Sequence, residues 1–402
     1  MPRSDIGIAL KALKWLVCCQ RPLSLSELAV AIAIEPGALH FDEEKKLDDD
    51  ALILTILGSL ARQNPETAAV EISHFSVVEY LTTPDLPDGT LNRYYINDIE
   101  GHADLLHCCL TMLSFDPSID DCFRAYAIFQ WPLHAKKSDH ARSGPLIEAF
   151  LSNPETLTFQ KWRDEWEGEF DPNLRVNLPD SHFGLYYAAL SSLPRAVETL
   201  LQSPEALKLS GSIALLAAAR DGNEEVVDLL LKAKADLGAR TALGWTVLHR
   251  AVYNRHISFV RKLVEAHVDV NIQDEDGWSP LHIAISEGYA EIAQVLVAHG
   301  ANPSTQLKES LWTPLHLAAQ QGMVDVAQSL VNAGASLTQL TDSAMTPLQI
   351  AVLHRQEKVF WLLVPKPAQQ DFEGCVNELG KRKDIDRRVP RLSAIASTTS
   401  RV

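Results

Sequence analysis

Apolar residues in the second half of the chain recur with the spacing of paired helices, and the pattern itself repeats. Leucines at 248, 281, 315 and 348 are separated by 33, 34 and 33 residues, and two degenerate copies precede them at 185 and 215. An alanine follows each leucine by three residues, and another leucine follows by fifteen. Because positions i and i+3 share one helix face, the pattern predicts six helix pairs that stack on their small alanines.

The ends of these predicted helices also carry recognisable residues. In "TPLH", Thr313 stands where an N-cap hydroxyl is favourable, and Pro314 occupies the first helical position, where a missing N–H costs nothing. Gly300 and Gly334 follow the second helix of their units and are expected to adopt a left-handed C-cap conformation. The sequence therefore predicts helix, turn, helix and turn in every unit.

The repeated motif T-P-L-H-x-A closely resembles the ankyrin repeat, over about residues 174–364. The resemblance is strongest at 246–251, 279–284, 313–318 and 346–351. The first two copies lack the Thr-Pro pair, Gln349 replaces a histidine, and Arg255 and Arg355 replace the glycine between the two helices. The resemblance implies an α-solenoid of about six repeats, with atypical units at its ends. It also implies binding of another protein through the turn tips and the exposed positions of the inner helices.

A large side chain follows the turn position in each of four units, as Trp245, Trp278, Trp312 and Met345. Two interpretations are open: the rings form an exposed row that anchors a partner, or each ring covers its own turn. Six further residues occupy positions that the resemblance assigns to partner contact. The predicted partner-binding residues are Trp245, Tyr253, Glu275, Asp276, Trp278, Glu287, Trp312, Gln320 and Gln321.

Residues 1–90 show a different pattern of three helices, a strand and a further helix. Ser24 and Glu27 form a capping-box motif, acidic residues 48–50 precede a helical segment, and "AAVEISHFSVVEYL" changes from strand to helix periodicity. This order predicts a winged-helix-like domain. DNA binding is disfavoured, because the segment contains seven Lys or Arg and fourteen Asp or Glu residues.

Several strings in the first half, over about residues 5–137, resemble fungal NOD-like (STAND) proteins, in the region between their nucleotide-binding NACHT module and their ankyrin array. The strings are "ISHFSVVEYL", "GHADLLHCCLTML" and "YAIFQWPLHAKK", the last containing Tyr126, Trp131 and His134. The resemblance implies that a helical connector at 91–173 joins the first domain to the repeats. No G-x-x-x-x-G-K-[ST] motif occurs, and "GCVNELGKR" at 374–382 lacks both the spacing and the hydroxyl that bind phosphate and magnesium.

The residues that most often carry catalysis do not form a catalytic motif. His249, His282 and His316 belong to the repeat, which favours a structural role over a catalytic one. The six cysteines include no C-x-x-C, and we expect them to be small buried side chains. The sequence predicts no catalytic residue, cofactor or metal, although an uncharacterised enzyme stays open as a weak alternative.

The segment 365–402 has few large apolar residues, and we expect it to be disordered. It concentrates basic residues in an otherwise acidic chain. Two interpretations are open, a nuclear-import signal or a solvated charge run. The basic residues are Lys381, Arg382, Lys383, Arg387 and Arg388.

The net charge of −16 opposes binding to nucleic acid and to anionic membranes. No secretory signal or membrane-spanning run is evident, so we expect a cytoplasmic or nuclear location. The predicted function is a non-enzymatic scaffold or regulator that binds a partner protein, in one version a nuclear transcriptional co-regulator that acts with a transcription factor. The alternative is the C-terminal arm of a fungal NOD-like receptor, in signalling or heterokaryon incompatibility, with an NTPase subunit as partner.

Overall fold

A computed structural model describes residues 3–47, 49–84, 95–115, 121–152, 156, 159–160, 162–163 and 183–364. The chain divides into two compact units. Unit 1 comprises residues 1–170 and 178–206, and unit 2 comprises residues 171–177 and 207–402. The predicted segment 365–402 and its basic residues lie outside the described residues, as does the predicted boundary at 174.

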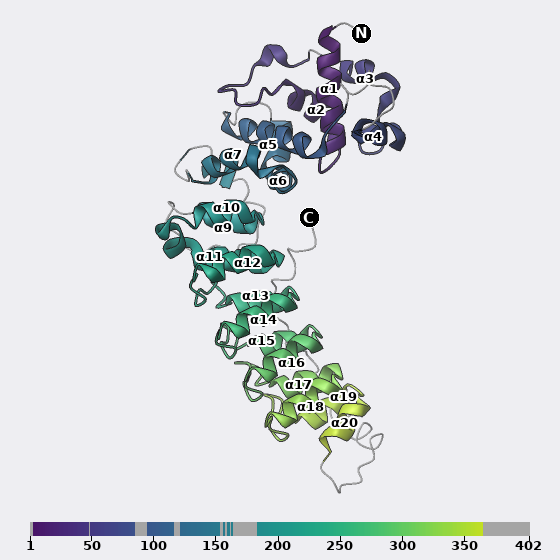
Figure 1. Ribbon diagram of the computed structural model, residues 1–402. Coiled ribbons are helices and arrows are strands. Elements are labelled where there is room, and N and C mark those ends of the chain that lie inside the picture. The colour runs from purple at the N-terminus through teal and green to yellow at the C-terminus, as the bar shows by residue number, and fades with distance from the viewer. Residues whose placement is uncertain are drawn as a thin grey trace. The chain divides into compact units, whose positions relative to one another are not determined.

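Unit 1 begins with short helices around a small antiparallel sheet (Figure 1). The strands lie in the order β1-β3-β2, with Leu23 opposite Val70 and Ala61 opposite Ile72. The chain order of helix, strand, two helices and two strands is compatible with a winged helix, which stays a prediction. The elements are α1 (Arg3–Cys18), β1 (Leu23–Ser24), α2 (Leu25–Ala33), η1 (Glu43–Lys45), α3 (Leu52–Leu57), η2 (Gly58–Leu60), β2 (Ala61–Gln63), β3 (Ala69–Ile72) and α4 (Phe75–Thr82).

The start of α2 shows the predicted capping box. Ser24 Oγ accepts the N–H of Glu27 at 3.2 Å, and the Glu27 carboxylate accepts the N–H of Ser24 at 2.8 Å. Arg21 pairs with the same carboxylate, at 2.5 Å. Two otherwise unpaired N–H groups are therefore satisfied before a helix whose residues from Glu27 to Ala33 are all buried.

Three further helices follow in unit 1, namely α5 (Asp98–Ser114), α6 (Asp121–Lys137) and α7 (His140–Ser152). Helix α5 packs against α1, α6 and α7. Trp15 of α1 is buried, and its ring meets Phe123 and Tyr126 of α6 edge-on, at centroid distances of 5.2 and 5.7 Å. These buried aromatic contacts thus hold α1 against α6.

The first helix pair of the repeat pattern, α9 (Phe183–Leu190) and α10 (Pro194–Leu200), packs on α7 within unit 1. Gly184 lies against the carbonyl of Leu151, with no room for a Cβ atom. Thr199 Oγ1 donates to Glu148 of α7 at 3.0 Å. Helix α7 therefore covers the face of this pair on which a preceding repeat would otherwise stack.

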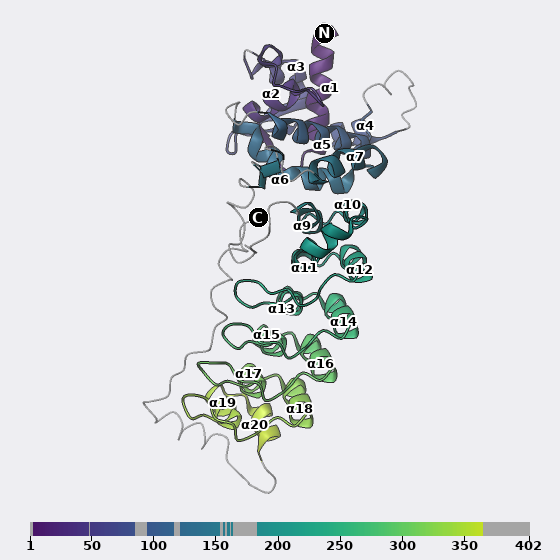
Figure 2. The same cartoon turned by 90° about the vertical axis from the view of Figure 1, so that its left-hand side faces the viewer.

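Unit 2 contains the other helix pairs (Figure 2). Figure 2 shows α13, α15 and α17 in one column beside the long turns, and α14, α16 and α18 in a second column. We call the first column the inner helices and the second the outer helices. The helices are α11 (Pro204–Asp221), α12 (Glu224–Lys232), α13 (Val247–Tyr253), α14 (Ile257–Glu265), α15 (Pro280–Ser286), α16 (Ala290–Ala298), α17 (Pro314–Gln321), α18 (Val324–Asn332), α19 (Pro347–Leu353) and α20 (Glu357–Leu363).

The predicted helix pairs and their packing are confirmed. The six periodic alanines all have no exposed surface, and α13, α15, α17 and α19 contact one another in sequence. Thr246, Ser279, Thr313 and Thr346 are N-caps with capping boxes, as the motif predicts. The fully buried alanines are Ala188, Ala218, Ala251, Ala284, Ala318 and Ala351.

The turn after each inner helix requires a left-handed residue. Gly222, Gly288 and Gly322 supply it with φ angles of 69°, 77° and 72°. Arg255 and Arg355 occupy the same position at 59° and 56°. Because a Cβ atom makes this conformation unfavourable, these two turns keep the repeat geometry at a cost in stability.

Candidate functional site

The turns that project beside the inner helices are linked to one another. The Glu275 N–H donates to the Leu243 carbonyl at 3.1 Å, and the Lys308 N–H donates to the Asp276 carbonyl at 3.1 Å. The Asp342 N–H donates to the Ser310 carbonyl at 3.0 Å. One backbone bond therefore joins each turn tip to the next and gives the array a continuous edge.

Two of the repeat histidines, His249 and His316, connect their inner helix to the next turn. The Thr246 N–H and hydroxyl lie 3.2 and 2.8 Å from His249 Nδ1, and His249 Nε2 lies 3.0 Å from the Trp278 carbonyl. The ring thus accepts at Nδ1 and donates at Nε2, as a neutral imidazole does. Thr313 and His316 repeat the arrangement, with Nε2 at 3.1 Å from the Met345 carbonyl.

These histidines are structural, as the sequence predicts. Burial lowers the pKa of His249, His282 and His316 to about 4, because desolvation disfavours the imidazolium. Gln349 takes the same place in the last pair, where its Oε1 accepts the Thr346 N–H at 2.9 Å. A side chain that accepts the N–H of the N-cap residue can therefore serve at this position, as Gln349 does. A role in proton transfer is not needed to explain the histidines.

Of the two interpretations of the tryptophans, their burial supports the one in which each ring covers its own turn. Trp245, Trp278 and Trp312 retain only 4, 3 and 6% of their surface, as this interpretation requires. Trp245 Nε1 donates to the Asp274 carboxylate at 3.0 Å, and its ring meets Tyr253 edge-on at 5.2 Å. The rings are buried because each closes the space between its turn and the histidine of its own repeat.

The other predicted partner-binding residues differ in exposure. Glu275, Asp276, Glu287 and Gln321 are exposed, and Tyr253 is half-buried. Gln321 Nε2 also donates to the Ser286 carbonyl of the preceding repeat, at 3.3 Å.

Gln320 is a further residue of the predicted partner-binding set that the structure shows to be buried. It retains only 7% of its surface, because it lies at the end of α17 beneath the next repeat. Its carbonyl accepts a hydrogen bond from Gln356 Nε2 at 3.1 Å. Gln320 therefore contributes to the junction between two repeats in addition to any contact with a partner.

Charges are arranged differently on the two faces of unit 2. On the outer helices, Lys262 pairs with Asp228 at 2.7 Å and Arg261 pairs with Glu291 at 3.2 Å. Each of these ion pairs joins two neighbouring repeats. At the turns, by contrast, the cations bind backbone oxygen atoms. Lys308 Nζ donates to the Glu275 carbonyl at 2.6 Å and forms no ion pair with the Glu275 carboxylate.

Unit 1 holds a buried polar chain that the sequence interpretation missed. His134 Nδ1 lies 2.9 Å from His102 Nδ1, His134 Nε2 lies 2.9 Å from the Tyr126 hydroxyl, and the Gln20 N–H donates to that hydroxyl at 3.0 Å. Burial lowers the pKa of His134 to about 3. Tyr126 and His134 are eight residues apart and share one face of α6, which was the available signal. These hydrogen bonds form a core network that satisfies its polar side chains.

Three cysteines of unit 1 are buried, namely Cys18, Cys108 and Cys109, whereas Cys19 and Cys122 are partly exposed. Burial raises the pKa of Cys18 and Cys108 to about 12 and that of Cys19 to about 11. Thiolates are the nucleophilic form, so a raised pKa disfavours reaction at these thiols, and the prediction of small buried side chains is confirmed for Cys18 and Cys108. Cys375 lies outside the described residues.

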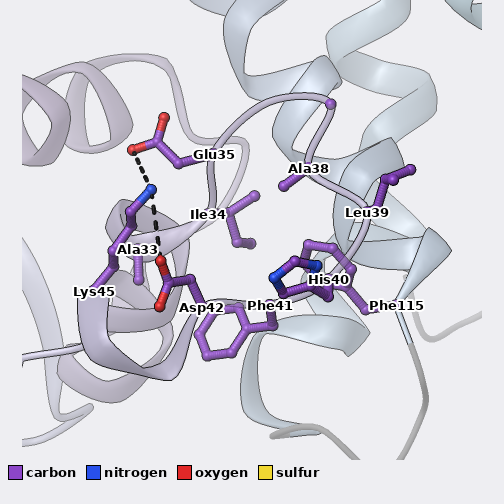
Figure 3. Close-up of a pocket in the computed structure, with 11 residues that line it drawn as sticks. Ala33, Ile34, Glu35, Ala38, Leu39, His40, Phe41, Asp42, Lys45 and Phe115 are labelled. Carbon is purple, nitrogen blue, oxygen red and sulfur yellow. Dashed lines mark ion pairs between the residues drawn. The ribbon is translucent and has the colours of Figure 1, made fainter.

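A cavity of about 390 Å³ lies between the loop after α2 and Phe115 (Figure 3). Figure 3 shows Lys45 between the carboxylates of Glu35 and Asp42, at 3.7 and 3.8 Å. Lys45 thus pairs with both carboxylates, Lys11 also pairs with Glu35 at 3.1 Å, and the rest of the lining is mainly apolar. This arrangement does not supply a nucleophile beside a base.

Metal-ligating side chains do not gather anywhere in the described part of the chain, where no group of three His, Cys, Asp or Glu could hold an ion. In the same residues, no helix combines the length and the apolar character needed to cross a membrane. The predicted import residues Lys381, Arg382, Lys383, Arg387 and Arg388 lie outside this part, so the import prediction is untested.

Comparison with known families identifies the repeats. Residues 185–274, 215–307, 259–341 and 305–373 match the family model for ankyrin repeats in sets of three copies. The match and the helix pairs agree, so the chain carries ankyrin repeats, which are protein interaction modules.

One curated relative is similar over part of the chain. It is the "Azaphilone pigments biosynthesis cluster protein L" of Monascus ruber, with 27% identity over 251 residues. The similarity covers 54% of this chain and 53% of the relative. The chain therefore spans about half the length of the curated relative it matches.

Proposed function

We propose that this chain is a non-enzymatic scaffold or regulator that binds a partner protein with the inner face and turn tips of its ankyrin repeats. The supporting observation is the contrast between a rigid frame and exposed polar side chains. The tryptophans and histidines of the frame are buried and bonded, whereas Glu275, Asp276, Glu287 and Gln321 remain available. A fixed surface with few available side chains loses little entropy on binding.

Affinity capture from native extract tests this proposal. The intact chain is compared with a variant that carries Tyr253→Ala, Glu275→Ala and Asp276→Ala on the inner face. The matched control carries Arg261→Ala and Glu291→Ala on the outer helices. We expect one retained protein to be lost from the inner-face variant only. Equal retention by all three folded proteins would contradict the proposal.

We further propose that the partner belongs to transcription, and that the chain is a nuclear co-regulator. The basic residues at 381–383 support this version. A fluorescent fusion should be nuclear and should become cytoplasmic when Lys381, Arg382 and Lys383 are changed to alanine. A fusion that is cytoplasmic from the start would exclude this version.

A second candidate function is the repeat-bearing arm of a fungal NOD-like receptor, with a partner NTPase subunit. The order of elements from α1 to α4 and the string "ISHFSVVEYL" support it. Co-purification of a NACHT-containing protein with the intact chain would favour this candidate over co-regulation. An enzymatic role is a weak third candidate, supported only by the relative's cluster name, and turnover of a cluster metabolite by the pure chain would establish it.

A further inference from the structure

The ends of the inner helices form one row of side chains along unit 2, which we call the inner row. It consists of two consecutive residues from each of four repeats. Only one of the eight carries a full charge, Glu287. The inner row is Tyr253, Asn254, Ser286, Glu287, Gln320, Gln321, Leu353 and His354.

Glu287 interrupts a hydrogen-bond pattern of this row. In the neighbouring repeats the equivalent residues are amides that donate to the preceding repeat. Asn254 Nδ2 lies 3.4 Å from the Ala219 carbonyl, and Gln321 Nε2 lies 3.3 Å from the Ser286 carbonyl. A carboxylate has no proton to donate, so Glu287 cannot make this bond. Its acceptor atoms therefore serve no purpose in the stacking of repeats.

The charge of Glu287 is also uncompensated. It makes no ion pair with any residue of 183–364, and burial alone raises its pKa. The cation in the adjacent turn, Arg255, lies over the Tyr289 ring at 5.6 Å. On the outer face, by contrast, Glu291 has its own cation, Arg261, at 3.2 Å. Glu287 is therefore an exposed carboxylate without a counter-charge, and a ligand can supply that charge.

A separate observation indicates the same ligand chemistry. The amide of Gln320 is more than nine-tenths buried, and its Oε1 makes no hydrogen bond with any described residue. Gln320 lies in the repeat that follows Glu287. Its neighbour Gln321 contacts the carbonyl of Ser286, the residue before Glu287. At the tip of the repeat that contains Glu287, Glu275 and Asp276 are exposed and make no ion pair with any residue of 183–364. The centre of the face thus holds acceptor groups that no donor of the described residues satisfies.

We propose that the inner row binds a linear segment of the partner through one lysine or arginine side chain, which pairs with Glu287. This inference rests on the proposed protein-binding function and specifies the partner's chemistry. The cation would donate to the carboxylate that the repeats themselves leave without a donor. Tyr253 in the preceding repeat would lie beside its aliphatic part. A charge-assisted bond to this carboxylate gives specificity at a single partner position.

The experiment uses the full chain and a phage-displayed library of random linear peptides. We expect the selected peptides to share a lysine or arginine at one position. Affinity of a labelled peptide is then measured by fluorescence anisotropy for the wild type and for Glu287→Gln, with Glu291→Gln as the matched outer-face control. Glu287→Gln should weaken binding about tenfold, the usual loss for one charge-assisted bond, and the control should not.

Combining a substitution in the peptide with Glu287→Gln tests whether the peptide's basic residue pairs with Glu287. Replacing the peptide's basic residue by alanine should weaken binding to the wild type by the same factor and add nothing on Glu287→Gln. Glu287→Gln should also remain folded, since the new amide can donate as Gln321 does. The inference is overturned if the selected peptides share no basic residue, if both variants weaken binding equally, or if no peptide is selected. The capture experiment tests protein binding independently of these outcomes.

Discussion

His249 Nε2 lies 3.0 Å from the carbonyl oxygen of Trp278, and this bond joins the inner helix of one repeat to the turn of the next. The same ring accepts two bonds from Thr246 at its other nitrogen. A neutral histidine therefore satisfies the start of its own helix and the start of the following repeat. The arrangement makes the stacking of repeats depend on the protonation state of a buried ring.

The first prediction is that the array loses stability in acid. The folded pKa of His249, His282 and His316 is about 4, below the unfolded value of about 6.5. The unfolded chain therefore binds more protons between these values, so stability is complete above pH 6.5 and falls as the pH drops toward 4. Each histidine contributes about 1.4 kcal/mol per pH unit. Urea denaturation at pH 7.5, 6 and 5 measures the loss.

A glutamine variant provides the control for this prediction. Gln349 shows that an amide can replace the cap function of the histidine. His282→Gln should therefore be less stable than the wild type at pH 7.5 but should show a shallower loss toward pH 5, by one histidine's contribution. An unchanged slope would mean that His282 does not bind a proton differently in the two states.

The repeats were predictable from the sequence because their framework is local and periodic. The alanine three residues after each periodic leucine, the Thr-Pro start and Gly300 each follow from helix geometry, and the structure confirms all three. The exposure of Trp278 was not predictable, because an amphipathic ring suits a turn and an interface equally. Burial of Gln320 depends on the next repeat, and the His102–His134 contact joins two helices, so neither has a local signal.

The second prediction concerns backbone strain. Arg355 has a φ angle of 56° in a turn where three repeats use glycine. Arg355→Gly should raise the free energy of unfolding by about 1 kcal/mol, since glycine adopts this conformation without a steric cost. Arg255→Gly should gain less, because it also removes the contact with the Tyr289 ring. Thermal denaturation of both variants checks the order, and a loss of stability in Arg355→Gly would refute the argument.

The third prediction separates framework from surface in the candidate site. Trp278→Ala should cost about 3 kcal/mol of stability, because it removes a buried ring between a turn and a helix. Glu275→Ala, at the exposed tip of the same turn, should change stability by less than about 0.5 kcal/mol. Chemical denaturation of both variants is the measurement. Similar stability of the two would mean that the ring is not part of the core.

The fourth prediction concerns the attachment of the first repeat to α7. A Cβ atom on Gly184 would overlap the Leu151 carbonyl, so Gly184→Ala must move α9 and should cost about 1 to 3 kcal/mol. Gly7 in α1 meets nothing within 4 Å, and Gly7→Ala should instead stabilise its helix by about 0.5 to 1 kcal/mol. Hydrogen exchange in α9 and α10 locates the effect. Equal protection in Gly184→Ala and wild type would show that the close contact is not required.

The last prediction tests the polar chain in the core of unit 1. The Tyr126 hydroxyl accepts from the Gln20 N–H and donates to His134 Nε2, which leaves His134 Nδ1–H to donate to His102. Tyr126→Phe keeps the ring but leaves two buried polar groups without a partner. Each such group costs about 1 to 3 kcal/mol.

Tyr80→Phe is the matched control, because that ring is exposed at the end of α4. Urea denaturation should show a lower midpoint for Tyr126→Phe and no change for Tyr80→Phe. The Tyr126 variant should also lose protection of the Gln20 amide in hydrogen exchange, since that N–H then has no acceptor. A protected Gln20 amide would mean that another group accepts the bond, and the direction of the proton chain would have to be reassigned.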